Sequence, residues 1–72
     1  MSIDGSLSVR INGENRHVPG GTTVAEMVSL LGLDPQRVAV ERNLEIVPRS
    51  ALTETQVEDG DDYEIVHFVG GG

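Results

Sequence analysis

The sequence contains no cysteine, no tryptophan and no lysine, and its aromatic residues are limited to Tyr63 and Phe68. Because cysteine is absent, disulfide bonds, thiolate metal sites and a thiol nucleophile are all excluded. The two histidines, His17 and His67, stand alone in the sequence, and a closed zinc site needs more ligands than they supply. We therefore expect no bound metal and a fold that depends on packing alone.

Positive charge is also scarce. Five arginines oppose twelve acidic residues, which gives a net charge of −7 at pH 7, and acidic side chains gather between residues 58 and 64. Binding to phosphate groups requires a concentrated positive patch, so nucleic acids and anionic membranes are unfavourable partners. A basic partner protein fits this charge better. The lack of lysine also leaves no side-chain amine that would capture an activated acyl group.

Long hydrophobic runs are missing as well. No segment approaches the ~20 apolar residues of a membrane span, and residues 1–6 have neither the basic nor the apolar region of a signal peptide. With 72 residues, of which 38% are hydrophobic, the chain has room for one domain. We expect a soluble cytoplasmic protein in which residues 1–6 form a short leader, residues 7–69 the domain and residues 70–72 a flexible tail.

The first part of the chain predicts a hairpin. Apolar and polar residues alternate over residues 7–11, which indicates a strand with one buried face. Asn12 and Gly13 follow, and this dipeptide is typical of a type I′ turn because both of its residues accept a positive φ. Residues 14–18 are therefore expected to return as the second strand.

A short amphipathic helix is predicted next. Thr23 and Glu26 have the spacing of a capping box, in which each side chain accepts a hydrogen bond from the other residue's backbone. Gly32 stands where a helix commonly ends in a left-handed residue. The apolar residues between these limits fall on one helical stripe, Val24, Met27, Val28 and Leu31, with Leu30 widening it.

Three later segments are predicted to be strands, residues 38–41, 45–47 and 63–69. The last of them follows a strong turn signal at residues 59–61 and is apolar on both faces, so we expect it in the centre of the sheet. The intervening residues 49–58 have weak periodicity and predict a loop with one helical turn, for which Thr53 is the candidate cap.

These elements predict an α+β fold in the order β-β-α-β-β-β. A single helix covers only one face of a sheet, so it should lie across a mixed sheet of four to five strands. The final strand should pair with the first. Because a crossover helix lies between them in the chain, the two strands should run parallel.

The sequence ends in three glycines, Gly70, Gly71 and Gly72, directly after the predicted central strand. Glycine loses the most entropy on ordering, so this segment should be mobile, and when extended it reaches on the order of 10 Å. Such a slim tail suits a narrow active site on another protein. The chain has no phosphate-binding glycine loop and no Ser/His/Asp set, which leaves its C-terminus as the best candidate for chemistry. A glycine run is by itself also typical of a frayed end.

Several segments of the sequence, taken together and in order, resemble a known family. They are the predicted ββα opening, Val-Ala-Val-Glu-Arg-Asn at residues 38–43, Ile-Val-Pro-Arg at 46–49 and Ile-Val-His-Phe-Val-Gly-Gly-Gly at 65–72. Over residues 7–72 the chain resembles the ThiS family of thiamin-biosynthesis sulfur carriers, which have the ubiquitin-like β-grasp fold. The resemblance implies that fold here.

The resemblance also implies a carrier cycle. The Gly72 carboxylate would be adenylated by an E1-like enzyme of the ThiF type, which uses ATP and Mg. Sulfur from cysteine, delivered by a cysteine desulfurase system, would convert it to a thiocarboxylate. Thiazole synthase of the ThiG type would then take up the sulfur for the thiazole ring. On this hypothesis the chain is a protein co-substrate without a cofactor of its own, and residues 70–72 enter the partner's active site.

The sheet face beside the tail is the expected docking surface, with Phe68, Val69, Tyr63 and Ile46 as its residues. Placement of these residues in the core is the competing interpretation.

Three alternatives to the thiamin carrier remain at this stage. A carrier of the same kind could serve molybdopterin synthesis or tRNA thiolation. A ubiquitin-like binding module would have an unreactive tail. An RNA-binding β-grasp domain conflicts with the negative charge.

Overall fold

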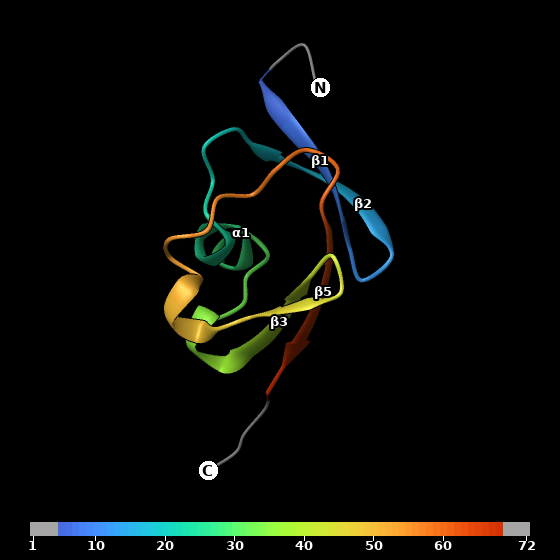
Figure 1. Ribbon diagram of the computed structural model, residues 1–72. Coiled ribbons are helices and arrows are strands. Elements are labelled where there is room, and N and C mark those ends of the chain that lie inside the picture. Colours follow the sequence, from blue (N-terminus) through green and yellow to red (C-terminus); the bar gives the residue numbers. More distant parts are fainter. Residues whose placement is uncertain (1–4, 69–72) are drawn as a thin grey trace.

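The computed structural model describes residues 5–68. These residues form a five-stranded sheet with one α-helix packed across it, and two short 3-10 helices lie in the connections (Figure 1). The predicted fold class and element order are confirmed. The elements in chain order are β1 (Ser6–Ile11), β2 (Glu14–Pro19), α1 (Val24–Leu30), η1 (Pro35–Arg37), β3 (Val38–Arg42), β4 (Glu45–Val47), η2 (Arg49–Ala51) and β5 (Asp62–His67).

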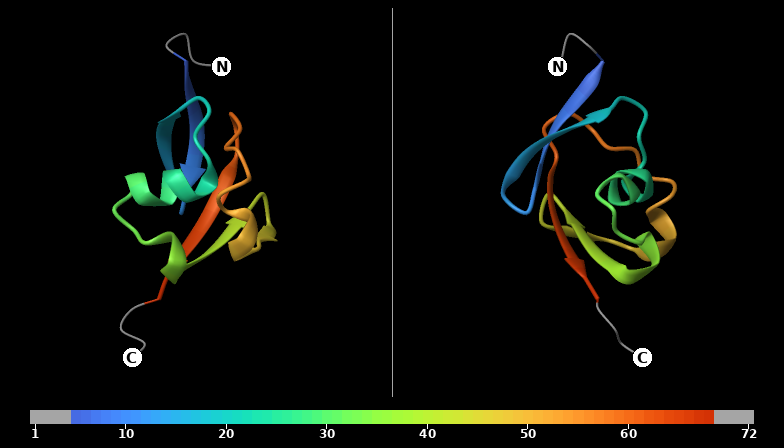
Figure 2. Two further views of the ribbon diagram at one scale, coloured as in Figure 1. Left: turned by 90° about the vertical axis from the view of Figure 1, so that its left-hand side faces the viewer. Right: turned by 180° about the vertical axis from the view of Figure 1, so that it is seen from behind.

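The sheet has the strand order β2-β1-β5-β3-β4, so β5 is central as predicted. It runs parallel to β1 and antiparallel to β3, which confirms the predicted crossover. Figure 2 shows α1 lying against one face of the sheet. We call the face that packs on α1 the inner face and the opposite one the outer face.

The core lies between α1 and the inner face of the sheet. Alternate residues of β1, β3 and β5 point into it, as expected for a half-buried sheet, and β2 adds Val18. The largest fully buried side chains are Tyr63, Met27, Val24, Val28, Val38 and Val40. Burial of these side chains is the main stabilising contribution in a chain too short for a large core.

The helix begins and ends where the sequence predicts. The Glu26 N–H donates to Thr23 Oγ1 (3.1 Å) and the Thr23 N–H donates to Glu26 Oε1 (2.9 Å), so the capping box is formed. Gly32 follows with φ +82°. The prediction that Leu30 widens the buried stripe is wrong, because Leu30 is 66% exposed while Ala25, on the other edge of the stripe, is buried. No helix within residues 5–68 is long and apolar enough to cross a membrane.

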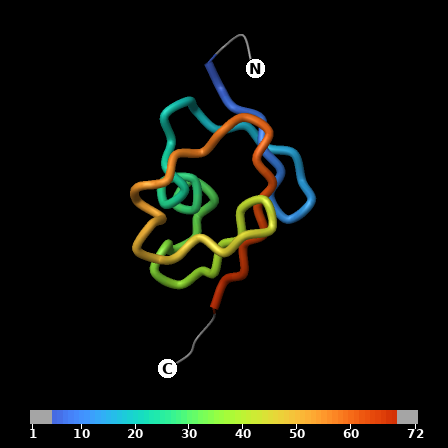
Figure 3. Tube along the Cα trace, in the orientation of Figure 1, coloured from blue at the N-terminus to red at the C-terminus, as the bar shows by residue number. Residues whose placement is uncertain are grey.

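The connection from β4 to β5 explains why burial extends toward Ala25. It passes along the start of α1 (Figure 3). The Val24 N–H donates to the Thr55 carbonyl (2.8 Å), and the Ala25 N–H donates to the Leu52 carbonyl (2.9 Å). These bonds satisfy amides that a helix leaves without partners at its N-terminus. The predicted helical turn is present as η2, but Thr53 follows η2 and does not cap it.

Two asparagines hold β5 from both sides. Asn12 and Asn43 occupy tight turns with φ +51°, which confirms the predicted turn at Asn12. The Asn12 side chain accepts from the Ile65 N–H (2.8 Å) and donates to the Ile65 carbonyl (3.1 Å). The Asn43 side chain accepts from the Asp62 N–H (3.0 Å). Each amide therefore extends the ladder along β5 beyond the end of a neighbouring strand.

We expect Asn12→Gly to lower the free energy of unfolding by about 2 kcal/mol, because glycine keeps the turn but loses both bonds to Ile65. Urea unfolding measures the change. Asn15→Ala, at an exposed position of β2, serves as the control and should stay within about 0.5 kcal/mol of the wild type. Equal stability of Asn12→Gly and wild type would show that the side-chain bonds contribute nothing.

Candidate functional site

The end of β5 is the part of the described chain closest in sequence to the glycine tail. Val69, Gly70, Gly71 and Gly72 lie outside the described residues, so the predictions for them stay predictions. Phe68 is the last described residue, and its N–H donates to the Arg37 carbonyl (2.8 Å). The backbone that leads toward the tail is thus hydrogen-bonded at Phe68 to Arg37, the residue that precedes β3.

Arg49, in the connection between β4 and β5, supports this end of the sheet. Arg49 Nη2 donates to the Val38 carbonyl (3.3 Å), and Val38 pairs with His67 in the β3–β5 register. The bond ties the beginning of η2 to the strand beside the tail exit. Arg49, the last residue of the Val-Pro-Arg segment that resembles the known family, therefore has a structural role.

The outer face carries three exposed apolar side chains, of which Val66 and Phe68 lie near this exit. Ile46 is 66% exposed, Val66 58% and Phe68 52%. Val66 is the register partner of Ala39, whereas Ile46 lies opposite Glu41, which pairs with Glu64, so Ile46 is on the same face but one row of outer residues further from the tail exit. We call Ile46, Val66 and Phe68 the outer-face patch. Exposed apolar groups collected on one face are typical of protein interaction sites.

The prediction that Tyr63 takes part in docking is corrected by its burial. Its exposed fraction is 0%, and its hydroxyl donates to Asp61 Oδ2 (2.8 Å). Tyr63 is on the inner face because it alternates with the outer residues of β5. Burial, together with the bond to Asp61, raises its pKa. Tyr63 is therefore a core residue with a satisfied hydroxyl.

Asp61 is the centre of a hydrogen-bond network at the start of β5. Its carboxylate accepts from Arg42 Nε (2.9 Å), Asn43 Nδ2 (3.1 Å), the Glu58 N–H (2.9 Å) and the Tyr63 hydroxyl. Burial raises the pKa of this carboxyl, but the four hydrogen bonds outweigh burial and hold the pKa below its ordinary value. The network fixes the turn that leads the chain into its central strand.

An acidic hollow adjoins Ile46 on the outer face and extends toward the end of the sheet away from the tail exit. Its volume is about 330 Å³, and it is lined by Glu41, Asn43, Leu44, Asp62 and Glu64. The described residues contain no group of three or more histidine, cysteine, aspartate or glutamate side chains that could hold a metal ion. The three carboxylates therefore give this end of the face a negative charge and no metal-binding geometry.

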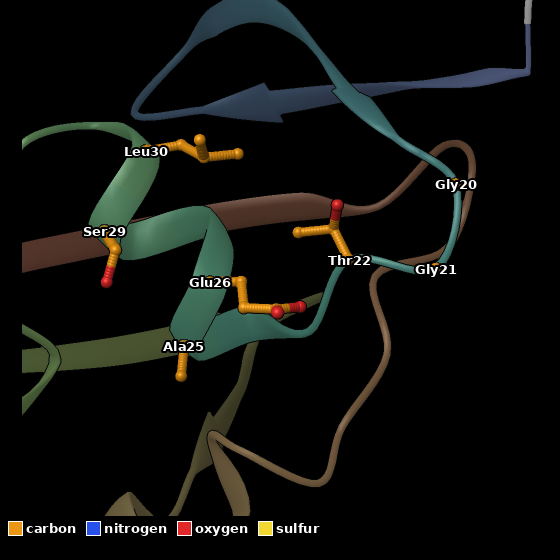
Figure 4. A pocket seen from close by; sticks show the side chains of 7 residues that line it. All are labelled: Gly20, Gly21, Thr22, Ala25, Glu26, Ser29 and Leu30. Atoms are coloured by element: carbon orange, nitrogen blue, oxygen red, sulfur yellow. The ribbon is translucent and has the colours of Figure 1, made fainter.

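A larger hollow lies on the other side of the molecule, between α1 and the loop that contains Gly20 and Gly21 (Figure 4). It measures about 580 Å³, and Glu26 is the one acidic or basic residue of its lining. That carboxylate is already used in the capping box. In the described structure neither hydroxyl of its lining, on Thr22 or Ser29, is hydrogen-bonded to a base, so the hollow lacks an activated nucleophile.

Ile46 and Phe68 are exposed apolar residues that the sequence analysis predicted for docking, whereas Val66 and Leu44 are exposed apolar residues that it did not name. The signal for Val66 was present, since it lies two residues from Phe68 in the same strand and must share its face. Leu44 follows Asn43 in a two-residue turn, a position where a large apolar residue is unusual. A leucine at this turn position was therefore the sequence signal for an exposed apolar residue.

Residues 9–72 match the ThiS family. The chain is 53% identical over 66 residues to a thiazole synthase of Paramagnetospirillum magneticum, an alignment that covers 92% of this chain and 20% of that protein. It is 42% identical over 50 residues to the sulfur carrier protein ThiS of Bacillus subtilis, covering 69% of this chain and 76% of that protein. The chain spans only 20% of the length of the two thiazole synthases it matches.

Solved structures give the same grouping. The crystal structure of a thiamine biosynthesis protein (ThiS) from Geobacter metallireducens aligns with a TM-score of 0.74 at 36% identity, covering 92% of this chain and 100% of that one. A computationally designed protein based on human ubiquitin aligns with a TM-score of 0.51 at 21% identity, covering 94% of this chain and 96% of that one. The second likeness concerns the fold alone and confirms the expected ubiquitin-like architecture.

Proposed function

We propose that this chain carries sulfur as a thiocarboxylate on Gly72, because it belongs to the ThiS family of small sulfur carriers of thiamin biosynthesis. The observation that supports this most is the family match, which runs through residue 72. Family members are carriers and not catalysts.

The proposed chemistry starts from a poor electrophile. A free carboxylate is anionic at neutral pH, so it must be activated before a sulfur nucleophile can replace one of its oxygens. In the proposed cycle a Gly72 oxygen attacks the α-phosphorus of ATP on an E1-like enzyme of the ThiF type, and pyrophosphate leaves. A persulfide sulfur, derived from cysteine through a desulfurase, then attacks the acyl carbon and displaces AMP to give an acyl disulfide. A thiol reductant cleaves the S–S bond of this acyl disulfide and leaves the thiocarboxylate. ATP and Mg belong to the partner, and this chain supplies the acyl group.

The proposed recipient of the sulfur is thiazole synthase. Two relatives in which this chain aligns with 20% of the protein are thiazole synthases, which links domains of this kind to that enzyme. This link favours the thiamin pathway over molybdopterin synthesis or tRNA thiolation. We place the cycle in the cytoplasm as part of the same proposal.

The folded domain would present the tail, and the outer-face patch would contact the enzymes. The Phe68 amide bonded to Arg37 fixes the direction in which the chain leaves β5. The exposed side chains of Ile46, Val66 and Phe68 lie on the face next to that exit. Val69 falls between patch and glycines, and its contribution to docking stays a prediction.

Growth tests the proposed function. In a strain that depends on this gene product for thiamin, the chain without its last two residues should fail to support growth, and added thiamin should restore it. Full growth of the truncated strain without thiamin would contradict the proposal. Restored growth with thiamin shows that the defect lies in this pathway.

We expect Ile46→Ala and Phe68→Ala each to weaken binding to the adenylating enzyme about tenfold, because each removes an exposed apolar contact at the docking face. Titration calorimetry measures the affinity, and thermal unfolding shows whether the fold is retained. Leu30→Ala is a matched control, since Leu30 and Ile46 are both 66% exposed but Leu30 lies on α1. Undiminished affinity of both patch variants would remove the docking role.

A further inference from the structure

The turn between β3 and β4 contains an exposed leucine in an unfavourable backbone conformation. Asn43 has φ +51° and Leu44 has φ +72°, and the Leu44 side chain is 91% exposed. Residues with a Cβ rarely adopt a positive φ, and a bulky apolar residue there is unusual. Side-chain packing within residues 5–68 does not compensate for this placement, because the leucine side chain is almost entirely outside the core.

The same molecule shows the expected solution at its other hairpin. Asn12 and Gly13 connect β1 and β2 with φ +51° and +84°, the same two-residue geometry with glycine at the second position. Glycine in place of Leu44 would fit the backbone and remove an exposed apolar side chain. Stability and solubility therefore both favour glycine, and the leucine points to a contact outside this chain.

The surroundings of Leu44 indicate the chemistry of that contact. Leu44 is part of the wall of the acidic hollow, together with the carboxylates of Glu41, Asp62 and Glu64. A complementary surface would have an apolar pocket for the leucine, bordered by basic side chains that meet the carboxylates. The net charge of −7 would steer such a surface toward this chain.

We propose that Leu44 and the acidic hollow anchor this chain on thiazole synthase through an apolar pocket with a basic rim. The inference rests on the proposed function, because it names the surface that one partner of the carrier recognises. Thiazole synthase is chosen since two relatives containing a domain like this chain are thiazole synthases. The anchor lies at the end of β3 and β5 opposite the tail exit, so it would hold the domain while leaving the tail free to enter the active site.

The first test uses the full chain and purified thiazole synthase in titration calorimetry. Leu44→Gly and Leu44→Asn should each bind about tenfold more weakly than the wild type, because both fit the turn and both remove the apolar side chain. Leu44→Gly should also melt about 4 °C higher, since the backbone strain is relieved. Leu30→Ala is the control and should bind as the wild type does. A merely structural leucine would not lower affinity while raising the melting temperature.

The second test concerns the charge. Wild-type affinity for thiazole synthase should fall as salt is raised, and the double variant Glu41→Gln/Glu64→Gln should show a weaker salt dependence. The proposal is overturned if both Leu44 variants bind thiazole synthase as tightly as the wild type, if they lose affinity only for the adenylating enzyme, or if binding is insensitive to salt.

These results are separable from the proposed function. If wild-type chain never gains sulfur, the carrier role fails, whereas the affinity comparison still decides the anchor. If wild-type chain gains sulfur and the Leu44 variants bind unchanged, only the anchor fails.

Discussion

Gly71→Val should reduce adenylation of the chain about a hundredfold or more. The proposed reaction requires the Gly72 carboxylate to reach the α-phosphorus of ATP inside a partner's active site, and small displacements of a reacting group have effects of that size. A β-branched side chain next to the reacting carbon widens the tail and restricts its backbone. ATP–pyrophosphate exchange with the adenylating enzyme measures the loss. A single residue added after Gly72 should have the same effect, because it moves the carboxylate.

Folding is expected to be unaffected by Gly71→Val, since the core is built within residues 5–68. Thermal unfolding of the variant should match that of the wild type. Thr53→Val, at an exposed position after η2, is the control for introducing a valine elsewhere, and its exchange activity should be normal. Wild-type exchange by Gly71→Val would show that the tail does not enter a narrow site.

Asp61→Ala should lower the free energy of unfolding by about 3 kcal/mol. The substitution leaves the Arg42 guanidinium, the Tyr63 hydroxyl and the Glu58 amide without their shared acceptor. In a domain of this size the loss corresponds to a melting temperature lower by roughly 15 °C. Asp62→Ala is the matched control, because the neighbouring Asp62 side chain is exposed and should contribute less than about 0.5 kcal/mol.

The effect of Asp61→Ala should depend on pH. The pKa of Asp61 is lower in the folded chain than in the unfolded chain, so its contribution is fully present above the unfolded value and is lost as pH falls through the folded value. The stability difference between wild type and Asp61→Ala should therefore be constant near neutral pH and should shrink below about pH 4. Urea unfolding across this range measures it. A difference that stays constant into strong acid would exclude the ionised carboxylate as its source.

Features that depend on neighbouring residues were predictable from the sequence. The turn at Asn12 and Gly13 and the capping box of Thr23 and Glu26 are specified by residues within four positions of each other, and both are formed. The central position of β5 also followed, because its apolar residues and the crossover connection restrict the topology. Local chemistry and chain connectivity were sufficient in these cases.

Features that depend on distant segments were not predictable. Leu30 was placed on the buried stripe because periodicity gives the direction of a stripe but not its edges, and the β4–β5 connection determines which edge is covered. Tyr63 was predicted to dock beside Phe68, with burial in the core as the competing interpretation. Alternation along β5 places Tyr63 and Phe68 on opposite faces, and Tyr63 is buried with its hydroxyl bonded to Asp61. The contact of Asp61 with Arg42, in contrast, is a pairing that no sequence pattern reveals.

The candidate site also has parts that were predictable from the sequence and parts that were not. The outer-face patch was partly predictable, since alternation places Val66 and Phe68 on one face of β5. The acidic hollow was not, because Glu41 and Glu64 become neighbours only through the register of β3 and β5. The sequence therefore indicates which strand leads into the glycine tail, while the structure shows which surface lies beside that strand.

The central claim is that Gly72 carries the sulfur, and intact-mass spectrometry of the chain tests it most directly. The full chain is incubated with the adenylating enzyme, ATP and a sulfur source, and is then fragmented to locate any change. The account predicts a species in which one terminal oxygen of Gly72 is replaced by sulfur, formed only when ATP is present. An unchanged mass under these conditions, or sulfur located on any other residue, would contradict it.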